Sequence, residues 1–347
     1  MTIKLIRMKR IICCFILFYS FTSVVKAQTA LDYMKEMGVE YKKIQDDTWG
    51  YVKATAHSKS ANKIEKSRAD LINTVRESIK NIKKLGAFES DKSLLDAAVN
   101  YLTLNEIILN EDYAKIVDLE VVADKSFHNM EAYLEAKKQA RVKLSNARDQ
   151  LSIAEREFAR KHNINLIQES DEQSEKLIKA SEAMDYYNKM YLIFFKSYKQ
   201  EYNAYNDLTL KDVNAFEESR KKLNEYSVEG SSNADQVGNF KNDPMMKNAT
   251  KKMMDFFKFE SSNVFLKYTD YFQKEAKMNE MSKKWEAIAP ENRTNDDVDK
   301  YNSVYDEYKQ AYDIYVKNYE EITSKRTTLI EEWNNTSSDF LSKYVPK

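Results

Sequence analysis

The side chains that most often perform chemistry are few and scattered in this chain. It has three histidines, His57, His128 and His162, which lie far apart in the sequence. A carboxylate-bridged di-iron site in a helical bundle needs Glu-x-x-His pairs on two helices, and the chain has none, because His128 and Glu131 stand in the reverse order. His162 ends a basic run, 160–162, at the end of an expected helix, where a cation is favoured by the helix dipole. We therefore predict no metal site and no cofactor.

Catalytic loops and nucleophile motifs are also missing from the sequence. No two of the five glycines fall within one short loop, so a phosphate-cradling loop is excluded, and no Gly-x-Ser-x-Gly elbow occurs. Adjacent acids at 46–47, 296–297 and 331–332 have the residue types of glycosidase carboxylates. With 55 acidic residues in the chain, however, solvated helix faces explain such pairs better. Asp296, Asp297 and Asp299 fit the first turn of a helix better than a calcium site. We predict that the protein is not an enzyme.

The first 27 residues have the three parts of a secretory signal peptide. A basic start is followed by an apolar run over residues 11–21. The sequence Val25-Lys26-Ala27 then places small or modest side chains before a cleavage site at Gln28. The apolar run is shorter than the ~20 residues of a transmembrane helix. The sequence therefore predicts export to the periplasm, the cell surface or the medium, with translation starting at Met1 or Met8.

Cleavage after Ala27 would change the composition of the chain. The only cysteines, Cys13 and Cys14, leave with the leader, so disulfides and cysteine-based metal or thiol chemistry are excluded from the mature chain. The leader also carries five basic residues and no acid, which leaves 50 basic against 55 acidic residues. This balance argues against nucleic-acid binding, which needs a basic face. We expect no transmembrane anchor after cleavage.

The body should be all-α. Five glycines and three prolines are too few for the turns of a β-rich chain of this length. Aromatic residues instead recur at spacings of three and four, which indicates long helices with an apolar seam that forms the core or lines a ligand site. The seam residues are Tyr187, Tyr191, Phe194 and Tyr198 on one helix, and Tyr301, Tyr305, Tyr308, Tyr312, Tyr315 and Tyr319 on another, with the heptad spacing of a coiled coil.

The chain contains an internal repeat at an offset of 152 residues. Its clearest part is a Gly-x-Phe-x-x-Asp corner, which occurs as Gly86, Phe88 and Asp91 and again as Gly238, Phe240 and Asp243. Each glycine can end a helix in a left-handed conformation, each phenylalanine can fill the corner, and each aspartate can cap the next helix.

The repeat predicts two tandem up-down bundles of about four helices, over 28–164 and 165–347, elongated and with long helices. The expected helices span 30–57, 60–85, 91–122, 126–162, 169–206, 210–227, 244–285 and 295–343. The segments 228–242 and 289–295 should be exposed loops.

These features resemble uncharacterised bacterial families of helical secreted or surface proteins. The resemblance rests on the leader, on the two corners and on the terminal stretch 340–346, Phe-Leu-Ser-Lys-Tyr-Val-Pro. It implies a location in the cell envelope or at the surface and carries no known activity.

Three functions remain open from the sequence. The first is a non-enzymatic envelope or surface protein that binds or scaffolds an unknown partner. The second is a periplasmic or secreted carrier that holds an apolar ligand between aromatic-lined helices. The third and least favoured is a carboxylate-dependent hydrolase. The segment 251–272, rich in Met and Phe, is apolar around much of its circumference and should be central in its bundle or part of an interface.

Overall fold

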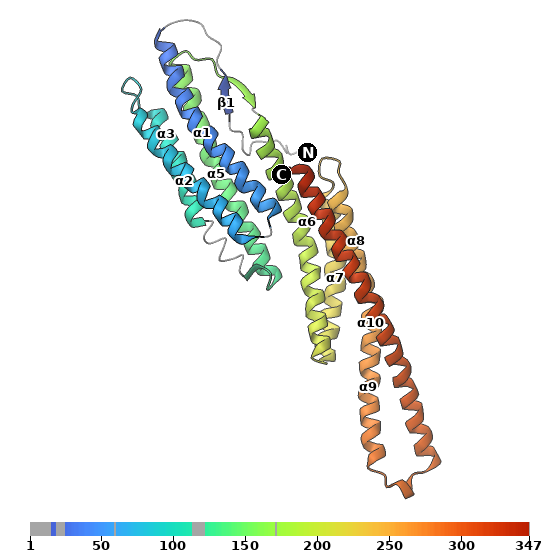
Figure 1. Cartoon of the computed structure of the whole chain (residues 1–347). Coiled ribbons are helices and arrows are strands. Elements are labelled where there is room, and N and C mark those ends of the chain that lie inside the picture. The colour runs from blue at the N-terminus through green and yellow to red at the C-terminus, as the bar shows by residue number, and fades with distance from the viewer. Residues whose placement is uncertain (1–14, 19–24, 59, 113–121, 171, 347) are drawn as a thin grey trace, which may run out of the picture. The chain divides into compact units, whose positions relative to one another are not determined.

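The computed structural model describes residues 15–18, 25–58, 60–112, 122–170 and 172–346 (Figure 1). Helices account for nearly all of this part, which confirms the all-α fold class. The helices are α1 (Val25–His57), α2 (Ala61–Leu85), α3 (Ser93–Ile107), α5 (Phe127–Lys161), α6 (Glu172–Thr209), α7 (Val213–Val237), α8 (Met245–Phe259), α9 (Phe265–Glu286) and α10 (Asn295–Tyr344).

Short elements complete the described chain. π-Helical turns follow α3 at Ile108–Asp112 and α8 at Glu260–Val264, and a 3-10 turn, Pro290–Asn292, precedes α10. Two short strands, β1 (Phe15–Phe18) and β2 (Ile167–Ser170), pair in antiparallel fashion. The predicted leader contains β1 and the first three residues of α1, and the rest of it lies outside the described residues. Residues Ala27 and Gln28, where cleavage is predicted, lie in the first turn of α1.

The chain divides into two compact units. Unit 1 comprises residues 1–188 and 341–347, and unit 2 comprises residues 189–340. The division therefore falls within α6, whereas the repeat places it between residues 164 and 165.

Unit 1 has a core in which α1 packs on α2, α2 on α3, and α3 on α5. Its centre is a group of aromatic rings. The ring of Phe88 lies 5.4 Å from that of Tyr33 and 5.5 Å from that of Phe158. The Tyr33 hydroxyl donates to the backbone oxygen of Gly86 at 2.8 Å, which ties α1 to the corner after α2. Burial raises the pKa of Tyr33 to about 12, so the hydroxyl remains a donor at neutral pH.

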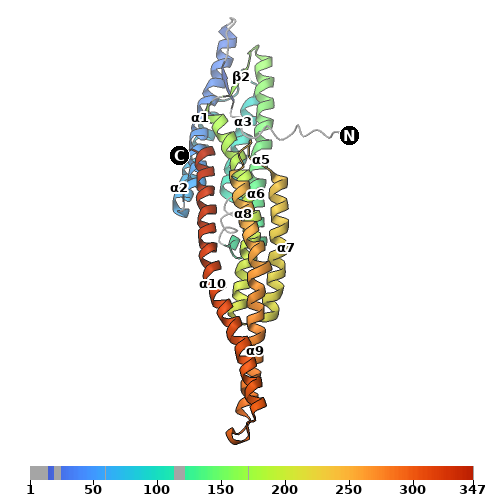
Figure 2. The same cartoon turned by 90° about the vertical axis from the view of Figure 1, so that its right-hand side faces the viewer.

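Unit 2 combines a packed helical part with a hairpin. Helix α7 packs on α8 and on α9, and Trp333 of α10 stacks on Phe194 of α6 with ring centres 4.2 Å apart. Beyond the turn that joins α6 to α7, α9 and α10 continue together as an antiparallel hairpin (Figures 1 and 2). Rings hold the hairpin together, such as Tyr271 on Tyr315 at 4.7 Å.

The two Gly-x-Phe-x-x-Asp corners have the same geometry. At each corner the Phe and Asp backbones exchange two hydrogen bonds, and an Asp oxygen accepts from the first N–H of the next helix at 2.9 Å. Gly86 has φ 69° and ψ −168°, and Gly238 has φ 75° and ψ −162°. The positive φ agrees with the prediction, but ψ is extended instead of left-handed helical. This combination is accessible almost only to glycine.

The correspondence extends over both neighbouring helices. Adding 152 to the bounds of α2, α3 and the first π-helical turn gives those of α7, α8 and the second π-helical turn. In the first copy Arg68 donates to Glu65 and to the backbone oxygen of Leu109, and in the second Arg220 donates to Glu217 and to that of Ser261. The arginine thus ties each first helix to the π-helical turn after the second.

The predicted loop at 228–242 is wrong for most of its length, because α7 continues to Val237. Gly230 is buried, and a Cβ atom there would lie 2.5 Å from the Met254 sulfur. The small side chains of this segment let α8 approach α7 closely. Packing therefore outweighs the poor helix propensity of Gly, Ser and Asn.

Three of the six tyrosines in the predicted seam on α10 are not buried, although the rings of Tyr312 and Tyr319 lie near those of Tyr271 and Tyr268. Tyr305, Tyr312 and Tyr319 remain 41–43% exposed, whereas Val304, Ala311 and Ile322 are buried. The half-buried Tyr301, Tyr308 and Tyr315 form one stripe with these aliphatic residues, and Val304 and Ala311 each directly precede an exposed tyrosine. The sequence contains both stripes, and only the packing of α9 selects between them.

A ligand cavity in unit 1 and a buried acid pair in unit 2

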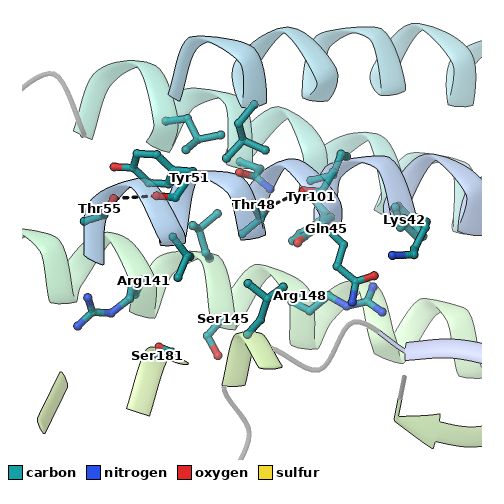
Figure 3. A pocket seen from close by; sticks show the side chains of 18 of the residues that line it. Lys42, Gln45, Thr48, Tyr51, Thr55, Tyr101, Arg141, Ser145, Arg148 and Ser181 are labelled. Carbon is teal, nitrogen blue, oxygen red and sulfur yellow. Dashed lines mark hydrogen bonds between the residues drawn. The ribbon is translucent and has the colours of Figure 1, made fainter. Parts of the chain in front are cut away.

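Unit 1 contains a cavity of about 190 Å³ (Figure 3). Its walls are one face each of α1, α5 and α6, with residues of α2 and α3 and Leu109 completing them. An apolar cavity of about 150 Å³ in another protein holds a benzene-sized molecule. The apolar and aromatic lining residues are Tyr41, Ile44, Tyr51, Val52, Leu71, Tyr101, Leu109, Leu144, Leu177 and Met184.

Helical spacing explains how the sequence builds these walls. On α5 the lining residues Lys137, Arg141, Leu144, Ser145 and Arg148 recur every three or four positions and therefore share one face. On α1 the same spacing brings Tyr41, Gln45, Thr48, Val52 and Thr55 to one face.

The polar groups of the α1 wall are tied to neighbouring atoms. Thr48 and Thr55 donate to backbone oxygens of their own helix, at 2.7 and 3.0 Å. The Gln45 amide donates to Ser174 at 2.9 Å. The two threonine contacts lie within α1, and the Gln45 contact joins α1 to α6.

Arg148 is the most enclosed cation in the wall. Its side chain is 12% exposed and its Nη1 donates to Glu155 at 3.1 Å. Its guanidinium lies 5.7 Å from the ring centre of Tyr41 and 5.9 Å from that of Tyr101, within range of a cation–π interaction. Figure 3 shows Arg148, Gln45 and Lys42 toward one end of the cavity and Arg141 toward the other.

The Tyr41 hydroxyl is buried and makes no hydrogen bond to a described residue. Burial, reinforced by the nearby Glu155 charge, raises its pKa well above the ordinary tyrosine value. The phenol is therefore neutral and offers an O–H donor. A buried donor without an acceptor costs free energy, which a ligand or a water molecule accepting from it would recover.

Unit 2 contains a different feature, a pair of buried carboxyls. Glu201 of α6 and Glu260, at the start of the second π-helical turn, are both fully buried and in hydrogen-bonding contact with each other. Arg326 of α10 binds Glu201 at 2.7 Å, and the Tyr205 hydroxyl donates to Glu260 at 2.8 Å. The Tyr268 hydroxyl is buried nearby.

The two carboxyls cannot both be charged at low cost. Burial is the main cause that raises both pKa values, and the Glu201 charge raises that of Glu260 further. Because Arg326 favours the charged form of Glu201, the proton resides on Glu260. One buried oxygen of each carboxyl has no other hydrogen-bond donor. A proton shared between these two oxygens forms a hydrogen bond that satisfies both. The pair is enclosed, so it has no access for a substrate.

The residues that the sequence singled out for chemistry do not come together. His57 is the last residue of α1, and His162 directly follows α5. The His162 ring packs 4.9 Å from that of Phe88, and His128 is exposed. Asp297 accepts from the Thr294 backbone at 2.9 Å, as expected at the start of a helix, and Glu331 and Glu332 are exposed. No group of three or more His, Cys, Asp or Glu side chains among the described residues is placed to hold a metal ion.

The cavity uses aromatic residues other than those of the predicted seams. Tyr41, Tyr51 and Tyr101 line it, and none of the seam residues on α6 or α10 does. The seam residue Phe194 is buried in the core of unit 2, and Tyr191 and Tyr198 are half-buried. A signal for the cavity exists in the sequence: Gln45 and Thr48 occupy positions of α1 that should otherwise be apolar.

Comparison of the chain with models of protein families, with curated proteins and with solved structures finds no match. Within the described part of the chain, no helix has both the length and the apolar composition needed to cross a membrane.

Proposed function

We propose that this protein is an exported, non-enzymatic binding protein that holds a largely apolar ligand between the helices of unit 1. The observation that carries the proposal is the cavity, whose surface is mostly apolar and also presents polar and charged side chains, as the surfaces of small-molecule sites do. The predicted leader supports a location outside the cytoplasm.

A glycine in the cavity wall gives a direct test. A Cβ atom added at Gly38, which lines the cavity, would meet nothing within 4 Å, so Gly38→Leu adds a side chain to the cavity wall without a clash at Cβ. Gly50 lies on the same helix, has equally open surroundings and is not a lining residue, so Gly50→Leu is the matched control. Both changes replace a helix-interior glycine and should stabilise α1 by about 0.5–1 kcal/mol.

Binding is measured with the fluorescent apolar probe N-phenyl-1-naphthylamine, titrated into the full chain. We expect the wild type and Gly50→Leu to bind with equal affinity and Gly38→Leu to lose at least ten-fold. Equal binding by all three proteins would place the probe outside the cavity, and the absence of binding to the wild type would contradict the proposal.

A second candidate function, scaffolding through a protein partner, is favoured by the half-exposed Tyr305, Tyr312 and Tyr319 on α10. Tyrosine is enriched at interfaces because it combines a large apolar ring with a polar hydroxyl. Native mass spectrometry of protein purified from its own cells distinguishes the two functions. A small excess mass lost on denaturation supports the ligand, and a second polypeptide supports the scaffold.

A further inference from the structure

Among the described residues, the charged groups that line the cavity in unit 1 are all of one sign. Lys42, Lys137, Arg141 and Arg148 are lining residues, and none of the described lining residues is Asp or Glu. The carboxylates that pair with these cations, such as Glu155 with Arg148 and Asp185 with Arg141, are not part of the lining. Of these described pairs, the cations therefore face the cavity and the carboxylates do not.

The end of the cavity at Arg148 is the better anion site of the two. The Arg148 side chain is 12% exposed against 20% for Arg141, so its interactions are less screened by water. Glu155 and the rings of Tyr41 and Tyr101 hold the guanidinium in place. A guanidinium presents five N–H donors in a planar fork, so one arginine can donate to several acceptors at once.

Tyr41 is a second, independent observation at this end of the cavity. It lines the cavity, contacts Arg148 through its ring, and carries a buried hydroxyl with no acceptor among the described residues. A neutral phenol and a guanidinium together form a donor pair that suits an oxyanion.

We infer that the cavity takes an amphipathic anion, an apolar chain or ring that ends in one carboxylate or phosphate held at Arg148 and Tyr41; this rests on the proposed function. The apolar body lies along Ile44, Leu144 and Leu177, which line the same cavity. Arg141 lies seven residues before Arg148 on α5, about 10 Å along the helix, and marks the other end of the site.

The test measures how three competitors displace N-phenyl-1-naphthylamine from the full chain: decanoate, decyl phosphate and decanol. They share one apolar chain and differ in the end group. We expect decanoate, decyl phosphate or both to compete at least ten-fold more strongly than decanol, because hydrogen bonds to charged groups are the stronger ones. The stronger of the two anions then identifies the end group as carboxylate or phosphate.

Variants locate the anion. Removing Arg148 alone would leave Glu155 buried and unpaired, so the informative change is the double variant Arg148→Gln with Glu155→Gln. We expect it to weaken the anion about ten- to hundred-fold and to leave decanol unchanged. Tyr41→Phe removes one oxygen and should weaken the anion about three- to ten-fold. Arg156→Gln, at an exposed position of the same helix, is the control and should change nothing.

Circular dichroism checks that each variant is folded. Three results would overturn the inference. If decanol competes as well as both anions, the proposal that the ligand is an anion is contradicted, while the proposed function stands. If Arg141→Gln with Asp185→Asn weakens the anion and the Arg148 variant does not, the position of the anion is wrong. If the probe does not bind the wild type, the proposed function fails and the inference fails with it.

Discussion

At the scale of single residues, the buried carboxyls of unit 2 make stability depend on pH in a direction opposite to that of most acids. Glu260 has a raised pKa in the folded protein because of burial and the neighbouring Glu201 charge. Its contribution to stability is complete below the unfolded pKa, about 4.3. Above that value the unfolded chain releases the proton and the folded chain keeps it, so the contribution falls as pH rises toward the folded pKa.

The unfolding free energy of Glu260→Gln should therefore increase relative to that of the wild type as pH rises. Glutamine keeps the shape of the protonated acid and cannot ionise. We expect the difference in unfolding free energy, variant minus wild type, to increase by at least about 1 kcal/mol between pH 5 and pH 8. Urea unfolding at the two pH values measures it, and the titrating groups that do not interact with Glu260 cancel in the difference. A difference independent of pH would show that Glu260 titrates normally.

Glu201→Gln should behave differently, although the two acids touch. It removes the carboxylate that binds Arg326 at 2.7 Å and leaves a mostly buried guanidinium without its partner. Breaking a buried ion pair costs about 3 kcal/mol. We expect a loss of that order at pH 7, measured by urea unfolding. If both variants changed stability equally, the assignment of the proton to Glu260 would be contradicted.

The residues of the two sites show where prediction from sequence stops. Spacing predicts that residues such as Tyr41, Gln45 and Thr48 share a face of α1. It does not predict that three such faces leave a space between them, because a cavity depends on distances between helices. The pairing of Glu201 with Glu260 and Arg326 is of the same kind, since it joins residues 59 and 125 positions apart in the chain.

At the scale of elements, the corners were the most predictable part of the molecule. Gly86 and Gly238 share an unusual backbone conformation, with φ of 69° and 75° and an extended ψ. Only glycine adopts it without strain, so the constraint is visible in the residue type. The π-helical turns and the continuation of α7 to Val237 were not predictable in this way, because they depend on packing and not on local propensity. The first turn packs on α2 and α5, the second packs on α7, and α7 itself packs on α8.

Gly238→Ala should destabilise the protein, although a Cβ atom at that position meets nothing within 4 Å. The cost comes from the backbone, because alanine is strained at φ 75° and ψ −162°, and amounts to about 1–3 kcal/mol. Gly86→Ala should cost a similar amount, since the two corners match. Thermal and urea unfolding measure both.

Gly50→Ala is the control for these substitutions. Gly50 is also surrounded by open space but lies inside α1, where alanine is the better residue by about 0.5–1 kcal/mol. A loss at the corners and a gain at Gly50 would attribute the effect to backbone conformation. A neutral result at Gly238 would show that the corner can relax to another conformation.

At the scale of the whole molecule, each unit has its own core, and the cavity and the buried acid pair lie in different units. The core of unit 1 begins close to the predicted cleavage site. Ala30 is fully buried, and Leu31, Tyr33 and Met34 follow it in the core. Of the predicted leader, the structure describes only β1 and residues 25–27, and the described contact that β1 makes is its pairing with β2.

A chain that begins at Gln28 should therefore be as stable as the chain that begins at Met1. All the core residues from Ala30 onward remain, and the change is confined to the start of α1 and the β1–β2 pairing. We therefore expect the two unfolding free energies to differ by no more than about 0.5 kcal/mol. Urea unfolding of both proteins, made without export, provides the comparison. The intact mass of protein exported by a bacterial host should correspond to residues 28–347. A full-length mass outside the cytoplasm would contradict cleavage, and a large loss of stability in the shortened chain would show that the leader is part of the fold.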